Sequence, residues 1–457
     1  MNRQLTSLTR TIAEGSTWLT GATIVTKFLG IATTLLTLAS LSVFEFGTTR
    51  LVLSALGIFS FFWLPGLSEI VVADMGIEKG KGRLASARNL LNQFFIYNVV
   101  CGILAFLSMF FGAQLIAVHL HNEYVTKLLQ ILSFTFLIGP LRSTAYVLWR
   151  VQYDFGAQSF HKTVEAGVKF ALTFYMLTVL KMNVIGYITV YVLTDLVAIV
   201  LFVHMVIRSY RHLGGTSEVE RLSLWGILLG HGKWVLAQGY VHNLVQTARL
   251  WIIKAVLGTE AVGLFSAAYG IFQHVVGVMP LKQVLASIIP QHDPRSDMFR
   301  KLIVKGVKYN IAMAIVLSVG ATVGVPMLVR VLLPDYVSAI PLFAVLLLGM
   351  IPGAASGVFT VVFFALRKQR SMFWVNVWLA GVTCVTLPVL LYVFGIYGVG
   401  VELLLVSVIF TWERYRHMCH VLPDMSLPWR VFFTFDEFDR RILRRVTDHV
   451  PFLRGVV

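Results

Sequence analysis

Residues 15–42, GSTWLTGATIVTKFLGIATTLLTLASLS, decide how the rest of the chain is interpreted. The stretch is long and apolar enough to cross a bilayer, which takes about 20 residues of helix. One face is nevertheless polar, because small, hydroxyl-bearing and cationic residues recur every three or four positions: Ser16, Thr20, Thr23, Lys27, Gly30, Thr34 and Thr37. A charge at the depth of Lys27 is costly when it faces lipid. We therefore expect Lys27 either to pair with a buried acid or to line a pathway for an anion.

The composition of the whole chain is that of a polytopic membrane protein. Of its 457 residues, 57% are hydrophobic and only 13% are charged. The formal net charge of +16 does not indicate nucleic-acid binding, because most cations fall in short loops between apolar segments. Cys101, Cys384 and Cys419 have no metal-ligand spacing, so we expect neither a metal nor a cofactor. The first apolar segment lacks a cleavage site, and we expect it to be retained.

Twelve apolar segments predict an all-α fold of about 12 transmembrane helices. They span residues 15–43, 47–75, 89–118, 124–149, 163–181, 183–207, 233–256, 261–289, 303–332, 337–366, 372–394 and 397–415. Cations gather in every second loop, while the alternate loops are short and nearly uncharged, as at residues 257–260 and 394–398. This distribution predicts a multi-pass protein whose N-terminus and C-terminus are both cytoplasmic.

The two halves of the chain show weak internal similarity. Trp18 and Trp234 each open a long segment that ends near an acid and a glycine, Gly47 in one half and Gly263 in the other. The corresponding positions are about 216 residues apart. A parallel repeat of two six-helix bundles is predicted. The expected domains are residues 1–207 and 233–418, joined by a cytoplasmic linker at 208–232 and followed by an amphipathic cytoplasmic tail at 419–457.

Deep polar residues supply the candidate site. The cations and their polar neighbours within apolar segments are Lys27, Arg50, Arg142, Gln238, His242 and Arg249, which we take as candidates for substrate binding. Arg50 has an open alternative, since it could extend to the outer interface. Glu69 and Asp195 are candidates for ion coupling, although Glu69 could instead neutralise an arginine. For Lys169 we expect a local ion pair with Glu165, four residues earlier.

No enzyme signature is present. The chain has no Gly-rich phosphate loop, no paired-ligand metal motif and no nucleophile elbow. His119 and His121 lie in a short loop without a third ligand, which is typical of solvated histidines rather than of a zinc site. We expect a protein that is not an enzyme.

The chain resembles the polysaccharide flippases of the superfamily that also contains multidrug extruders and lipid II flippases. The resemblance rests on the Trp18 helix with Lys27, on VQYDF at 151–155 and on LGTEAVGLFSAAYGIF at 257–272, and it extends over nearly the whole chain. It implies two six-helix bundles that form a V around a central cavity. It also implies transport of an undecaprenyl-pyrophosphate-linked oligosaccharide from the cytoplasmic to the outer leaflet of a bacterial inner membrane, by alternating access.

Two other functions compete with a flippase. A cation-coupled multidrug antiporter of the same fold needs a deep acid, and deep cations outnumber deep acids here. A polymerase or ligase of lipid-linked glycans is disfavoured because the outer loops are short. The expected partners are the lipid-linked oligosaccharide, membrane lipids and other polysaccharide assembly proteins, and no nucleic acid. In the flippase, Lys27, Arg142 and Arg249 should line one shared cavity whose cations select an anionic substrate.

Overall fold

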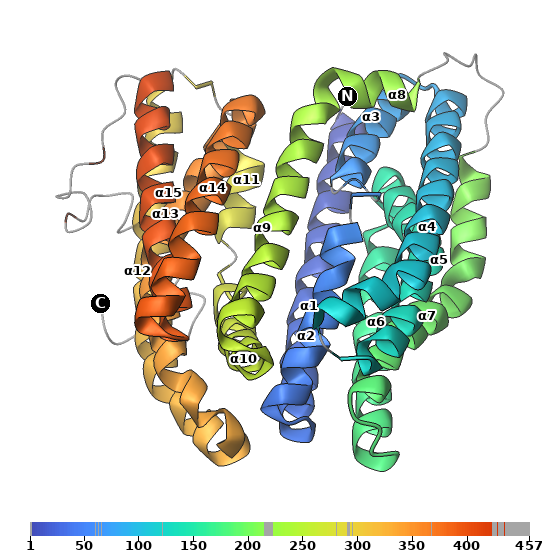
Figure 1. The fold of residues 1–457 in the computed structure, drawn as a ribbon. Coiled ribbons are helices and arrows are strands. Elements are labelled where there is room, and N and C mark those ends of the chain that lie inside the picture. The colour runs from blue at the N-terminus through green and yellow to red at the C-terminus, as the bar shows by residue number, and fades with distance from the viewer. Residues whose placement is uncertain are drawn as a thin grey trace, which may run out of the picture. The chain divides into compact units, whose positions relative to one another are not determined.

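The computed structural model describes residues 2–59, 61, 62, 64, 66–120, 122–213, 223–279, 281–289, 293, 294, 296–366, 368–422, 427 and 434. Every regular element in these residues is a helix, which confirms the predicted all-α class (Figure 1). The chain divides into two compact units. Unit 1 contains Met1–Val275, Ala321–Leu347 and Gln369–Val406, and unit 2 contains Val276–Gly320, Leu348–Lys368 and Ser407–Val457.

Unit 1 holds most of the helices. They are α1 (Asn2–Ser40), α2 (Val43–Phe59), α3 (Leu67–Gly80), α4 (Leu84–Leu120), α5 (Tyr124–Gln152), α6 (Phe155–Phe174) with the π-helical η1 (Tyr175–Val179), α7 (Val184–His212), α8 (Leu224–Ile227) with η2 (Leu228–Gly232), α9 (Lys233–Leu257), α10 (Thr259–Val276), η4 (Pro334–Ala339) and α14 (Gln369–Phe394). Unit 2 holds α11 (Leu281–Ile288), and α12 (Asp297–Leu332), α13 (Ile340–Ala365) and α15 (Tyr397–Val421) have residues in both units.

Each of the twelve apolar segments coincides with one long helix or with two helices in succession. Within the described residues, seven helices are long and apolar enough to cross a membrane by themselves: α1, α4, α5, α7, α12, α13 together with η4, and α14. The remaining segments are interrupted or carry charges. The second segment, for example, divides into α2 and α3, because Leu64 and Gly66 between them have positive φ angles of 41° and 95°. The chain therefore passes the membrane several times.

A capping box fixes the start of α2 directly after α1. The Ser42 hydroxyl accepts a hydrogen bond from the Glu45 backbone N–H at 3.3 Å, and the Glu45 carboxylate accepts one from the Ser42 N–H at 3.0 Å. This reciprocal pair satisfies donors that the first turn of a helix leaves free. The short α1–α2 connection is therefore a sharp, defined corner.

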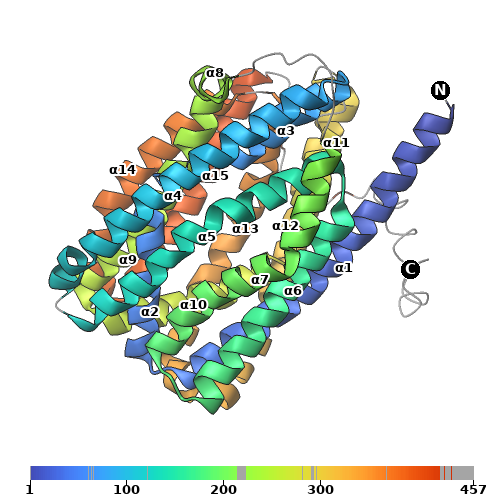
Figure 2. The ribbon, with the colours of Figure 1, turned by 90° about the vertical axis from the view of Figure 1, so that its right-hand side faces the viewer.

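A layer of long helices forms one side of unit 1. Contacts run from α3 to α4, then through α5, α7 and α6 to α1, and Figure 2 shows these helices in that order. On its other side α2 packs against α9, which in turn packs against α14. Helices α1, α2, α6, α7 and α9 thus bring residues from both halves of the sequence into one unit.

Helices α2 and α10 touch through a reciprocal pair of glycines. A Cβ atom on Gly47 would lie 2.1 Å from the Thr259 carbonyl oxygen, and one on Gly263 would lie 2.1 Å from the Val43 carbonyl oxygen. Only glycine permits so close an approach of two backbones. Val43 and Thr259 are 216 residues apart, as are Gly47 and Gly263. Such reciprocity is what an internal duplication predicts, although superposition of the two halves stays a prediction.

An apolar cluster packs beside this glycine contact, at the corner between α1 and α2. It contains Leu38, Leu41, Phe46, Tyr187 and Tyr336, among other residues. The Tyr336 hydroxyl donates to the Leu41 carbonyl oxygen at 3.0 Å, and its ring meets the Phe46 ring edge-on with centroids 6.1 Å apart. The interior of unit 1 is therefore closely packed with apolar side chains at this end.

The predicted domain boundaries stay a prediction, since unit 1 groups residues from both expected bundles. Most of the expected amphipathic tail, including residues 435–457, lies outside the described residues. In unit 2, Arg414 of α15 is buried and donates to the Ser356 carbonyl and hydroxyl oxygens, both at 3.0 Å. That arginine is a deep cation which the sequence analysis did not single out.

Candidate functional site

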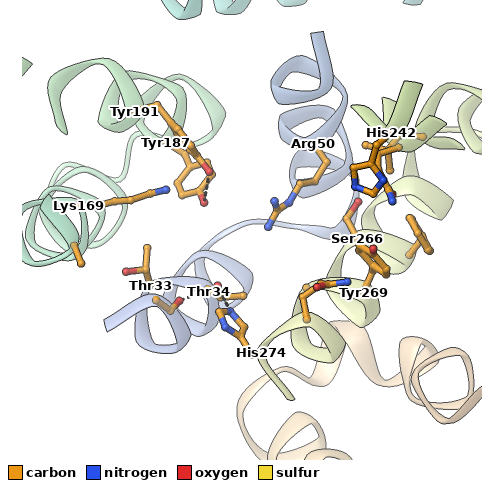
Figure 3. Close-up of a pocket in the computed structure, with 17 residues that line it drawn as sticks. Thr33, Thr34, Arg50, Lys169, Tyr187, Tyr191, His242, Ser266, Tyr269 and His274 are labelled. Carbon is orange, nitrogen blue, oxygen red and sulfur yellow. Dashed lines mark hydrogen bonds between the residues drawn. The ribbon is translucent and has the colours of Figure 1, made fainter. Parts of the chain in front are cut away.

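A cavity of about 760 Å³ lies among α1, α2, α6, α7, α9 and α10 of unit 1. Its lining contains cationic, hydroxyl, amide and aromatic side chains and no carboxylate (Figure 3): Gly30, Thr33, Thr34, Arg50, Ala166, Lys169, Tyr187, Tyr191, His242, Gln246, Leu250, Phe265, Ser266, Tyr269, Gly270, Gln273 and His274. Ligand pockets in proteins commonly measure ~300–1,000 Å³. The cavity is therefore large enough for a polar head group.

Arg50 enters the cavity from the second turn of α2. Its guanidinium lies 4.7 Å from the centre of the Phe46 ring, and its Nε is buried without a hydrogen-bond partner in the described residues. No described carboxylate forms an ion pair with it. Of the two alternatives that the sequence left open, the structure shows the cavity position. Arg50 therefore offers unused donors and an uncompensated positive charge.

Lys169 enters the same space from α6 (Figure 3). Its Nζ lies 3.9 Å from the centre of the Tyr191 ring, a cation–π contact. The expected ion pair between Lys169 and Glu165 is wrong, because the Glu165 carboxylate is bound by Arg142 and Tyr146 instead. Lys169 is thus a cavity cation that the sequence analysis assigned to a local pair.

Arg142 is held by two acids and does not line the cavity. Its Nη1 donates to Asp195 Oδ1 at 2.6 Å and to Glu165 Oε1 at 3.4 Å, so one guanidinium joins α5, α6 and α7. The Asp195 side chain is only 7% exposed. This pairing departs from the expectation that Arg142 binds substrate. It also gives Asp195, a candidate for ion coupling, a cationic partner on α5.

Arg249 is paired as well, with an acid that the sequence analysis missed. Its Nε and Nη2 donate to the two carboxylate oxygens of Glu402 on α15, at 3.3 and 3.4 Å, and the Arg249 and Glu402 side chains are 3% and 0% exposed. The Thr383 hydroxyl of α14 donates to the same carboxylate at 2.9 Å. Glu402 lies inside the last apolar segment, residues 397–415, so a search of the sequence for acids within apolar segments would have found it. Contrary to expectation, Arg249 does not line the cavity. It does donate a hydrogen bond to Gln246, which lines the cavity.

The other candidates divide between the cavity and its surroundings. His242 lines the cavity, whereas Gln238, one turn earlier on α9, does not. Lys27 is half-buried on α1 and outside the lining, three residues before Gly30, which lines the cavity. His274 Nε2 lies 3.1 Å from the Thr34 hydroxyl. The structure therefore brings Arg50 and His242 together, with Lys27 close to the cavity.

Glu69 belongs to a separate place, between α3 and α5. Both of its carboxylate oxygens accept hydrogen bonds from Arg150, at 2.5 and 2.7 Å, and its side chain is 60% exposed. A smaller cavity of about 250 Å³ lies beside this pair. Glu69 is therefore paired with an arginine outside the large cavity, and a role for it in ion coupling stays a prediction. The described residues contain no cluster of histidine, cysteine and acid that could hold a metal ion, and His121 lies outside them.

The sequence of this chain matches a family described as "Polysaccharide biosynthesis protein" over residues 40–341. The chain belongs to this family. No curated protein sequence matches it significantly.

Solved structures with a similar fold come from multidrug transporters. An inward-facing multidrug resistance MATE family transporter of the MOP superfamily matches with a TM-score of 0.70 at 11% identity, covering 88% of this chain and 96% of that one. The outward-facing form matches with a TM-score of 0.66 at 12% identity over 90% and 97%. A mutant of the Vibrio cholerae MATE transporter VcmN gives 0.61 at 12% identity over 93% and 100%. At such identities the likeness shows the fold alone, which is that of MOP-superfamily transporters.

Proposed function

We propose that this chain is a flippase that moves an undecaprenyl-pyrophosphate-linked oligosaccharide from the cytoplasmic to the outer leaflet of a bacterial inner membrane, by alternating access. The translocated lipid-linked oligosaccharide would serve surface polysaccharide biosynthesis. The family supports the polysaccharide part of the proposal, and the fold supports transport.

The observation that carries the proposal is the charge of the cavity. Arg50 and Lys169 line it without an ion pair to any described residue, and no acid is part of the lining. Deep cations are costly unless something negative offsets them. A pyrophosphate supplies at least two negative charges together with several acceptor oxygens. Its phosphates would lie between Arg50 and Lys169, with His242 and His274 as further polar contacts.

The aromatic part of the lining supports a sugar-bearing ligand. Tyr187, Tyr191 and Tyr269 combine an apolar ring with a hydroxyl group, and all three line the cavity. Such side chains suit a ligand that is polar at its edges and apolar on its faces. The first sugars next to the pyrophosphate would therefore have rings to pack against.

The orientation predicted from the loop charges supports the proposed direction of transport. With both termini cytoplasmic, the corner between α1 and α2 faces the outer side. The apolar cluster around Phe46 and the contact of Gly47 with Gly263 would then close the cavity toward the outer leaflet.

A cation-coupled multidrug antiporter remains the competing function, because the similar solved structures are multidrug transporters. It would need an available acid in the cavity. The deep acids Asp195, Glu165 and Glu402 are instead bound to arginines. This pairing favours the flippase.

Complementation tests the proposal. In a strain that lacks the gene, we expect Arg50→Ala together with Lys169→Ala to abolish surface polysaccharide and to cause the lipid-linked intermediate to accumulate, at unchanged protein level. Lys127→Ala removes an exposed lysine of α5 and is the matched control. Wild-type polysaccharide in the double variant would contradict the proposal.

A further inference from the structure

The cavity contains one neutral side chain whose orientation the surrounding charges dictate. Gln246 lines the cavity from α9, and its side-chain oxygen accepts a hydrogen bond from Arg249 Nη1 at 2.9 Å. An arginine has only donors, so the atom that faces it must be the amide oxygen and not the amide nitrogen. The NH₂ group of Gln246 therefore points away from Arg249.

The arginine that sets this orientation, Arg249, is itself held by hydrogen bonds. Two hydrogen bonds to Glu402 hold it across α9 and α15, and Thr383 of α14 holds that carboxylate in turn. The pair is almost completely buried. Rotation of the Gln246 amide by 180° would turn its N–H groups toward the Arg249 guanidinium, so that donors would face donors without an acceptor between them. The amide is thus held in one orientation.

The NH₂ group of Gln246 has no hydrogen-bond partner among the described residues. Its donors add to those of Arg50, whose Nε also lacks a partner. A ligand between them meets donors from two helices and no acceptor from the Gln246 amide. Such a site suits an oxyanion, which only accepts hydrogen bonds, and disfavours an ammonium group, which only donates them.

We infer that Gln246 is a fixed hydrogen-bond donor to the oxyanion of the transported ligand, and that the buried Arg249–Glu402 pair is the positioning element that holds its amide in the donating orientation. This inference rests on the proposed function. It assigns an indirect role to Arg249. The guanidinium does not contact the anion, but favours it by orienting the Gln246 amide.

Equilibrium binding of farnesyl pyrophosphate to the purified protein in detergent tests the donor role, with farnesol as the uncharged probe. We expect Gln246→Met to weaken farnesyl pyrophosphate binding about tenfold, the loss of one hydrogen bond to a charged group. Gln238→Met, on the same helix but outside the lining, should leave the affinity unchanged. Gln246→Glu keeps an acceptor oxygen for Arg249 but removes the NH₂ donors, so it should weaken farnesyl pyrophosphate binding further. This variant replaces Gln246→Met should Gln246→Met fail to fold.

A double-mutant cycle tests the positioning role. Arg249→Met combined with Glu402→Leu removes the pair without leaving a buried charge, and should weaken farnesyl pyrophosphate binding several-fold. In a protein that already carries Gln246→Met, adding Arg249→Met and Glu402→Leu should not weaken farnesyl pyrophosphate binding further, because the pair acts through Gln246. Additive losses would overturn the positioning role, since a merely structural contribution would persist.

The outcomes separate this inference from the function on which it rests. Unchanged farnesyl pyrophosphate binding in Gln246→Met and Gln246→Glu would overturn the inference alone. Wild-type protein that binds farnesyl pyrophosphate no better than farnesol would overturn the proposed function, and the inference with it.

Discussion

The deep cations of unit 1 fall into two classes that the structure distinguishes clearly. Arg142 and Arg249 form ion pairs with acids, while Arg50 and Lys169 face the cavity without an acid. Paired cations cannot offer a full charge to a ligand, whereas unpaired ones gain from an anion. The same residue type therefore serves packing at one position and recognition at another.

Loss of one member of the Arg249–Glu402 pair should be costly. Glu402→Leu leaves a buried guanidinium uncompensated, and we expect the free energy of unfolding to fall by about 3–5 kcal/mol. Adding Arg249→Met should recover most of this loss, because the remaining charge is then gone. Chemical unfolding in detergent, followed by tryptophan fluorescence, measures both. Equal stability of Glu402→Leu and wild type would show that the pair is not buried as described.

Asp195→Asn should be milder, since Arg142 keeps Glu165 as a partner. We expect a smaller loss of stability than for Glu402→Leu in the same unfolding experiment. The variant also tests the ion-coupling role that the sequence suggested for Asp195. If transport activity disappears while stability is retained, Asp195 has a role beyond its ion pair.

Sequence reasoning found the deep arginines but not their partners. Asp195 is 53 residues from Arg142, and Glu402 is 153 residues from Arg249, so no local pattern connects them. The local pair between Lys169 and Glu165 was wrong for a related reason: Arg142 competes for Glu165 from another helix. Which cations stay unpaired is therefore a property of helix packing, and only the structure reveals it.

At the scale of single elements, hydrophobic patterning predicted the helices well. Each apolar segment became helical because a bilayer requires internally satisfied backbone groups. The interruption between α2 and α3 was not expected, because it depends on local φ angles at Leu64 and Gly66. Glycines that allow close helix contacts were visible as Gly47 and Gly263, but their direct contact was not.

The α2–α10 contact gives a prediction for the elements. Gly263→Ala places a methyl group 2.1 Å from the Val43 carbonyl oxygen, so α2 and α10 must separate. Spin labels at the exposed positions Phe44 and Glu260, in a background without the three native cysteines, should report a longer distance by pulsed electron paramagnetic resonance.

Gly112→Ala is the control for that experiment, because a Cβ atom there meets nothing within 4 Å. It should leave the distance between the labels unchanged. An unchanged distance in Gly263→Ala as well would contradict the close contact. Lower transport activity with a longer distance would link this contact to closure of the cavity.

For the whole molecule, the sequence was sufficient to predict a multi-pass helical protein of the polysaccharide biosynthesis class, and family and fold agree with this. The site was predicted only in part. Arg50 and His242 line the cavity as expected, while Gln238 and the paired arginines do not. Lys169 was assigned to a local ion pair, and Gln246 was not among the candidate residues. Contacts among six helices decide these roles, and no single segment contains that information.

We propose that the cavity carries an anionic lipid across the membrane. Proteoliposomes with a fluorescently labelled prenyl pyrophosphate test it directly, since a membrane-impermeant quencher reports movement between leaflets. We predict that the wild-type protein moves this lipid much faster than labelled prenol, and that Arg50→Ala with Lys169→Ala removes the difference while Lys127→Ala retains it. Equal rates for the charged and uncharged lipids in the wild-type protein, or faster movement of a labelled cationic lipid, would contradict the claim.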